Sequence, residues 1–197
     1  MTRIAIQPNM IQWACERAGF GMTDLEHRFP NLSRWHRGES QPTLKQVEAF
    51  AKATYTPVGY LFLQEPPVER VPIPDYRAGG EGDIRHPSPD LLDTIYVCQQ
   101  RQEWYRDYAR SMGEEPFAFV GSMTVRDEIV RAAQTIRTAL GFNVNERRKM
   151  PTWTDALRRF IDQADDLGVM VMCNGVVHNN NHRHLDPEEF RGFSMAD

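Results

Sequence analysis

Apolar residues recur at spacings of three and four in five short segments of the first sixty residues, as expected of amphipathic helices. These segments begin at Pro8, Thr23, Leu32, Thr43 and Thr56. Two of them carry the capping-box spacing that starts a helix, Thr23 with Glu26 and Thr43 with Gln46. Gly38 is placed to end the third segment. Helices of this length are unstable alone in water, so the pattern predicts that all five share one core.

Two short helices joined by a tight turn and braced by three others predict a compact helix-turn-helix unit over residues 1–63. In the helix that begins at Leu32, the second of this pair, Leu32 and Trp35 would face the core. The outward positions, candidates for contact with DNA, are Asn31, Ser33, Arg34, His36 and Arg37. Candidate phosphate contacts near the start of the next helix are Gln41, Thr43 and Lys45. The alternative is a five-helix bundle that contacts only proteins.

The segment LEHRFPNLSRWHRGESQPTLKQVEAFAKA, within residues 11–63, resembles the Xre/Cro-type helix-turn-helix family. WHRGESQPTL is similar to the family's pattern at the end of the recognition helix, where an aromatic or aliphatic residue, a charge, a Gly and a Pro recur. His36 stands where the family commonly has Glu, which makes this helix more basic. The resemblance implies binding to double-stranded DNA.

Proline and glycine punctuate residues 64–90, which predicts an irregular, semi-rigid linker. The prolines are Pro66, Pro67, Pro72, Pro74, Pro87 and Pro89, and the glycines are Gly79, Gly80 and Gly82. Ser88-Pro89-Asp90 then predicts the start of a long helix that reaches about Met112. Its heptad-like apolar stripe is Leu91, Ile95, Cys98, Gln102, Tyr105, Ala109 and Met112. That stripe fits either the core of a second domain or the interface of a homodimer.

Two further helices are expected in the C-terminal half, opened by Thr124 with Asp127 and by Thr152 with Asp155. Their predicted inward residues are Val125, Ile129, Ala132, Ala133, Ile136 and Leu140 in the first, and Trp153, Leu157, Phe160, Ile161 and Ala164 in the second. Short strands are predicted at residues 169–172 and 190–195. The expected fold class is therefore mainly α (α+β), with a small β element at the C-terminus of a domain over residues 91–197.

Three C-terminal segments, DLLDTIYVCQQRQEWYRDYAR, LGVMVMCNGVV and LDPEEFRGFSMAD, resemble the opening half of an ImmA/IrrE-type (DUF955) metallopeptidase domain. In that family a later helix carries His-Glu-x-x-His, whose histidines hold zinc and whose Glu is the general base. The sequence ends at Asp197 without this motif. The resemblance therefore supplies no catalytic residue, and zinc is expected only in a longer parent protein. His178, His182 and His184 are interpreted as a solvated turn and not as a metal site.

The distribution of charge and the number of cysteines indicate where DNA would bind and in which compartment the protein works. Residues 1–60 hold seven basic and five acidic residues, a formal charge of +2, while the remainder carries −6, which gives the chain −4. This asymmetry fits DNA contact at one end. Three scattered cysteines and the lack of an apolar leader or membrane-spanning run favour a reducing bacterial cytoplasm.

The leading hypothesis is a sequence-specific DNA-binding transcriptional regulator. The alternatives are the recognition half of a zinc metallo-endopeptidase and an antitoxin-like module that binds a protein partner.

Overall fold

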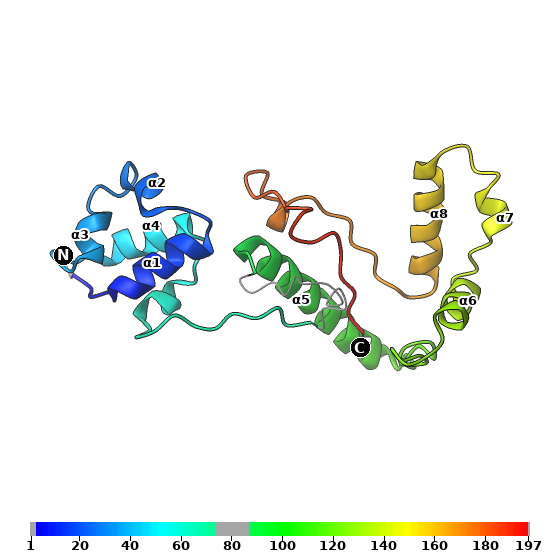
Figure 1. Cartoon of the computed structure of the whole chain (residues 1–197). Helices are drawn as coiled ribbons and strands as arrows, with labels where there is room; N and C mark the ends of the chain where they lie inside the picture. The colour runs from blue at the N-terminus through cyan, green and yellow to red at the C-terminus, as the bar shows by residue number, and fades with distance from the viewer. Residues whose placement is uncertain (1–2, 74–86, 197) are drawn as a thin grey trace. The chain divides into compact units, whose positions relative to one another are not determined.

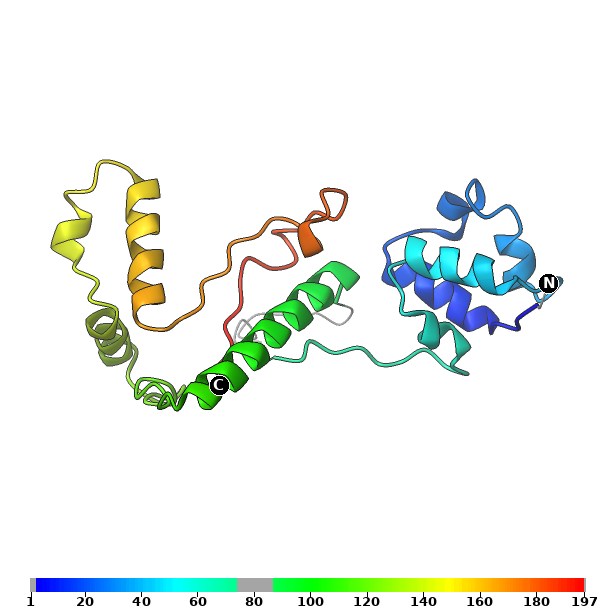
Figure 2. The ribbon, with the colours of Figure 1, turned by 180° about the vertical axis from the view of Figure 1, so that it is seen from behind.

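The computed structural model describes residues 3–73 and 87–196, and these are mainly helical (Figure 1; seen from behind in Figure 2). The mainly α character of the predicted fold is therefore confirmed. Within the described residues, β pairing is confined to isolated bridges between Arg3 and Thr43 and between Val176 and His184. The chain divides into two compact units. The first takes in the described parts of Met1–Cys98 and Val176–Gly192, and the second those of Gln99–Gly175 and Phe193–Asp197.

The N-terminal bundle, defined here as residues 3–63, contains all five predicted helical segments. They are α1 (Pro8–Arg17), α2 (Met22–Glu26), α3 (Leu32–His36), α4 (Leu44–Ala53) and the 3-10 helix η1 (Val58–Phe62). Their apolar faces meet in a single buried cluster, as predicted. Its members are Ile11, Ala14, Cys15, Leu25, Phe29, Leu32, Trp35, Val47, Phe50, Ala51, Ala53 and Leu61. The outer surface of the bundle is therefore presented on a packed support.

One of the two predicted capping boxes of the bundle is confirmed and the other is wrong. The Thr43 hydroxyl accepts from the Gln46 amide, and the Gln46 side chain accepts from the Thr43 amide at 2.9 Å. At α2, however, the cap is Gly21, whose amide donates to Asp24 Oδ2 at 2.7 Å. The extended backbone of Gly21 starts the helix two residues earlier than Thr23 would. The spacing of Thr23 and Glu26 therefore does not determine the first residue of α2, because the turn before the helix determines it.

The described part of the predicted linker, up to residue 73, lies along the bundle. The Asn9 side-chain amide donates to the Gln64 carbonyl at 3.1 Å, and Arg17 forms an ion pair with Glu69 at 2.6 Å. As predicted, this stretch contains no regular helix beyond η1. The predicted glycine cluster falls in residues 74–86, outside the described residues.

Helix α5 (Pro89–Met112) starts where Ser88-Pro89-Asp90 predicted, with the Ser88 hydroxyl accepting from the Leu91 amide at 3.0 Å. Its first half is buried through Leu91, Leu92, Ile95 and Cys98. Its second half exposes Trp104, Tyr108 and Met112, and the Trp104 and Tyr108 rings stack at 5.8 Å. Along the predicted apolar stripe, burial falls from Leu91, Ile95 and Cys98, which are buried, through half-buried Gln102, Tyr105 and Ala109 to exposed Met112.

Three helices follow in the second unit, α6 (Ile129–Ala139), α7 (Val144–Arg147) and α8 (Trp153–Asp166). The Thr152 cap of α8 is confirmed, since its hydroxyl accepts from the Asp155 amide. The predicted start of α6 at Thr124 is wrong. Thr124 and Asp127 form a separate turn, and the Glu128 carboxylate caps α6 by accepting from the Val130 and Arg131 amides.

Of the residues predicted to face inward on α6 and α8, only Ala164 is buried, which corrects that prediction. Ile129 is 82% exposed and Trp153 is 71% exposed, and α8 buries only Ala156 and Ala164. Helical spacing predicts which side of a helix is apolar. It does not provide the neighbouring element that must cover that side.

The two predicted strands, at residues 169–172 and 190–195, are absent from the structure. Both segments are extended or irregular, and Val169, Met170 and Met172 are exposed. Two isolated strands are unstable in water unless a ladder partner or a packed face supports them. The chain from Val176 to Gly192 instead turns back beside α5, where the Glu189 carboxylate accepts from the Ser88 amide and hydroxyl (Figure 1).

Candidate nucleic-acid interface

Helix α3 is held on the bundle by two apolar anchors. Leu32 and Trp35 are buried, and the Trp35 ring lies 6.3 Å from that of Phe29. Because these anchors face inward, the side chains of Arg34 and Arg37 project outward, with 56% and 57% of their surface exposed. Arg34 in α3 and Arg37 at its C-cap are therefore exposed, as the spacing predicts.

The end of α3 has the hydrogen bonds of a Schellman motif. Gly38 is left-handed, with φ of +72°, and its amide donates to the Trp35 carbonyl at 3.0 Å. The Glu39 amide donates to the Arg34 carbonyl at 2.9 Å. This pair of bonds is the one that glycine allows after the last turn of a helix. The backbone therefore turns sharply at Gly38 and returns Glu39 to the side of α3.

Glu39, which the sequence-based set of site residues lacks, is the common ionic partner of both arginines. Arg37 Nε donates to Glu39 Oε1 at 2.6 Å, Arg37 Nη2 donates to Oε2 at 3.2 Å, and Arg34 Nε lies 3.8 Å from Oε2. The hydrogen bond from Arg37 lowers the pKa of the Glu39 carboxyl, and the same bond raises the pKa of Arg37. The signal in the sequence that could have indicated this pairing is an acidic residue directly after Gly38, the glycine that ends α3.

The other predicted residues of α3 differ in how exposed they are and in whether their side chains are already hydrogen-bonded. Asn31 is exposed at the N-cap position of the helix, whereas His36 is half-buried. The Ser33 hydroxyl donates to the Glu26 carboxylate, which ties α3 to α2. Asn31 is therefore the uncharged α3 side chain best placed to meet a ligand, and Ser33 serves first as a bridge within the bundle.

The loop before α4 places the remaining predicted residues. Lys45 is exposed in the first turn of α4, and Gln41 is exposed beside it. The Thr43 hydroxyl and amide are both engaged in the capping box. Thr43 therefore orients the helix start and is not the donor that a phosphate would meet first.

Arg3 is a second residue that the sequence-based set lacks. Its Nη1 donates to the Gln41 carbonyl at 2.6 Å, and the adjacent Ile4 amide donates to the Pro42 carbonyl at 2.9 Å. These contacts join positions 38 residues apart in the sequence. No local pattern could have revealed them. They bring an exposed guanidinium to the loop that carries Gln41.

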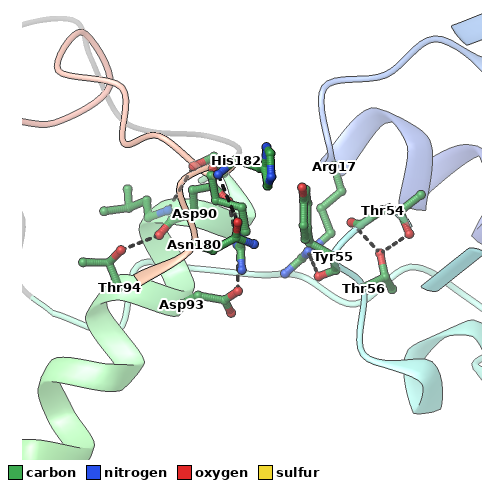
Figure 3. Close-up of polar contacts among 12 residues, drawn as sticks. Arg17, Thr54, Tyr55, Thr56, Asp90, Asp93, Thr94, Asn180 and His182 are labelled. Carbon is green, nitrogen blue, oxygen red and sulfur yellow. Dashed lines mark hydrogen bonds and ion pairs between the residues drawn. The ribbon is translucent and has the colours of Figure 1, made fainter. Parts of the chain in front are cut away.

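A second polar cluster lies between α5, the C-terminal loop and the bundle (Figure 3). The labelled members from α5 and the loop are Asp90, Asp93, Thr94, Asn180 and His182. Arg183, which is buried, pairs with Asp90 at 2.5 Å and with Asp93 at 2.8 Å, and its guanidinium lies 4.2 Å from the centre of the Tyr55 ring. These fixed partners give Arg183 a structural role.

Arg17 is likewise bound to groups of the protein. It donates to the Tyr55 carbonyl at 2.8 Å and to both carboxylate oxygens of Glu69 at 2.6 and 2.8 Å. Arg183, which is buried, and Arg17, whose side chain is 6% exposed, thus both pair with groups of the protein itself. The cations of Arg34, Arg37 and Lys45 differ because they are exposed to solvent.

The histidine segment near the C-terminus is a turn, as predicted. Val177–Asn179 forms the short 3-10 helix η2, and the turn places His178 and Asn179 at positive φ. Among the described residues, no three His, Cys, Asp or Glu side chains gather in a way that could hold a metal ion. Nor does any helix of the described segments have the length and apolar composition needed to cross a membrane.

Comparison of this chain with protein-family models, with curated proteins and with solved structures finds no match.

Proposed function

We propose that the N-terminal bundle is a helix-turn-helix domain that binds double-stranded DNA, and that the protein is a DNA-binding regulator. The observation that carries the proposal is the pair of exposed arginines, Arg34 and Arg37, on a helix anchored by Leu32 and Trp35. A short helix with a buried inner side and a cationic outer side suits the major groove of DNA.

Each exposed side chain has a distinct proposed role. The forked guanidinium of Arg34 or Arg37 matches the O6 and N7 acceptors of guanine, and the Asn31 amide matches the edge of adenine. Lys45, in the first turn of α4, and Arg3, bound to the Gln41 carbonyl of the preceding loop, are proposed to contact phosphates, which fix position without reading sequence. The charge of +2 on residues 1–60 supports binding through this end of the chain.

The test is a selection of duplex DNA with the full chain at defined salt, because phosphate contacts make the affinity depend strongly on salt. Arg34→Ala or Arg37→Ala is expected to weaken binding to the selected sequence by about 1–3 kcal/mol where that arginine reads a guanine. Lys45→Ala is expected to weaken binding to all sequences and to reduce the slope of log affinity against log salt by about 1.

Lys52→Ala is the matched control. Lys52 is also exposed on α4 and lies seven residues beyond Lys45, which is about two turns along the same side of the helix. Its loss removes the same charge from the last turn of α4 and not from the first. Equal effects of Lys45→Ala and Lys52→Ala would show that only net charge matters. Unchanged affinity in both arginine variants would overturn the proposed interface.

A further inference from the structure

The backbone at the end of α3 determines where the Glu39 side chain starts. The left-handed Gly38 and the bonds that end α3 hold the Glu39 amide 2.9 Å from the Arg34 carbonyl. A carboxylate attached at this point lies within reach of both exposed arginines of α3. The ion pairs of Glu39 are therefore built into the end of this helix.

Glu39 occupies the donors that DNA would use. Arg37 offers it Nε and Nη2, at 2.6 and 3.2 Å, in the two-bond geometry by which guanidinium binds carboxylate, phosphate or the edge of guanine. A DNA acceptor must either displace the Glu39 carboxylate from this edge of Arg37 or approach with a negative charge close by. Either route weakens the contribution of Arg37 to binding.

We infer that Glu39 is a built-in competitor of DNA for Arg37 and Arg34, and so limits the affinity of the α3 surface. The inference rests on the proposed DNA-binding function. It adds Glu39 to the residues that determine the affinity of that surface, because its carboxylate binds the guanidinium groups that would otherwise bind acceptors of DNA. An exposed ion pair is weak and sensitive to salt, so the competition is graded and not an on–off switch.

The experiment compares the full chain with Glu39→Gln, which keeps the shape of the side chain and removes its charge. Binding to the selected duplex is measured by fluorescence anisotropy at several salt concentrations. Glu39→Gln is expected to bind about fivefold more tightly at low salt, the factor that corresponds to one exposed ion pair. The gain should shrink as salt rises, because screening already weakens the pair in the parent chain.

Glu48→Gln is the charge-matched control. Glu48 is exposed on α4 and its substitution changes the net charge of the bundle by the same amount. The inference expects a clearly smaller gain from Glu48→Gln than from Glu39→Gln. Equal gains would overturn it, since the effect would then come from net charge alone.

A double-mutant cycle tests the route through the arginines. In an Arg37→Ala background, Glu39→Gln is expected to lose most of its gain, and retention of the full gain would overturn competition for Arg37. If Arg34→Ala and Arg37→Ala weaken binding while Glu39→Gln leaves it unchanged, the inference fails and the proposed function stands. If neither the parent chain nor Glu39→Gln binds any duplex, the proposed function fails and the inference falls with it.

Discussion

Two aromatic pairs with nearly the same ring geometry lie in regions of very different burial. Phe29 and Phe50, in the N-terminal bundle, meet edge to face at 5.6 Å and 85°. Phe142 and Phe160, in the second unit, meet at 5.6 Å and 82°. Phe50 is 1% exposed, whereas Phe160 is 39% exposed. The pairs differ in what surrounds them and not in how the rings meet.

The surroundings differ because the bundle closes on itself and the apolar faces in the second unit do not. In the bundle, each amphipathic helix contributes to one shared buried cluster. In the second unit, α6 buries none of its residues and α8 buries only two alanines. Amphipathic spacing is present in both regions, so the comparison separates the apolar character of a helix from its burial. Three predictions use this contrast, in order of decreasing effect.

The largest expected effect is on thiol reactivity. Burial, followed by the nearby Glu16 carboxylate, raises the pKa of the Cys15 thiol to about 11, and Cys15 lies in the buried cluster of the bundle. Cys173 is exposed. At pH 8, Cys173 is expected to react with a thiol reagent more than about a thousandfold faster than Cys15, which must wait for the core to open.

Mass spectrometry of the labelled protein assigns the modified cysteines over time. Labelling in denaturant should reach Cys15, Cys98 and Cys173 and serves as the control. Labelling of Cys15 at the rate of Cys173 without denaturant would show that the bundle core is not closed.

The next effect is on the free energy of unfolding. Phe50→Ala is expected to cost about 3–5 kcal/mol because it leaves a cavity in a packed core. Phe160→Ala has the matched ring partner but a partly solvated site, so its cost is expected to stay below about 2 kcal/mol. Urea denaturation followed by circular dichroism gives both values. Equal losses would contradict the distinction between a closed core and an open apolar face.

The smallest effect concerns Gly168, at the end of α8. Its φ is +91°, and an added Cβ would overlap the ring of Phe117. Gly168→Ala should therefore cost about 1–2 kcal/mol in left-handed strain, with a smaller overpacking part because the exposed Phe117 ring can move aside. Gly141→Ala is the control, since its φ is +63° and its added Cβ would meet only the Gln163 side chain at an ordinary 3.6 Å.

Hydrogen exchange at the Val169 amide, which donates to the Ala164 carbonyl at 2.9 Å, reports the change at Gly168. Adding Phe117→Ala to Gly168→Ala should recover the overpacking part and leave the strain. Identical protection in Gly168→Ala and in the double variant would mean that Phe117 does not pack there.

Much of the bundle could be predicted because its signals are local. Thr43 and Gln46 start α4 from within four residues, and Gly38 ends α3 by adopting a backbone that other residues avoid. Leu32 and Trp35, three residues apart, share the inner side of α3, which leaves Arg34 and Arg37 outside. The outward residues of the candidate interface follow from that spacing.

Other features of the interface depended on contacts that spacing does not encode. Arg3 reaches the Gln41 carbonyl across 38 positions, and Ser33 is bound to Glu26 of another helix. Glu39 lies close to Arg37 in the sequence, yet it meets the arginine only because the chain reverses at Gly38. Residue types and spacing alone suggest which groups are proposed to contact DNA, and the turn at Gly38 decides that Arg37 is already paired.

The second unit shows the same division more strongly. Its sequence by itself determined where α8 starts, at the Thr152 cap, and which sides of α6 and α8 are apolar. Only the tertiary structure decided that Ile129 and Trp153 remain exposed and that residues 169–172 form no strand. Helix starts and apolar sides are set by neighbours within a few residues. Burial and strand pairing require a second segment to come close, which periodicity along one segment does not specify.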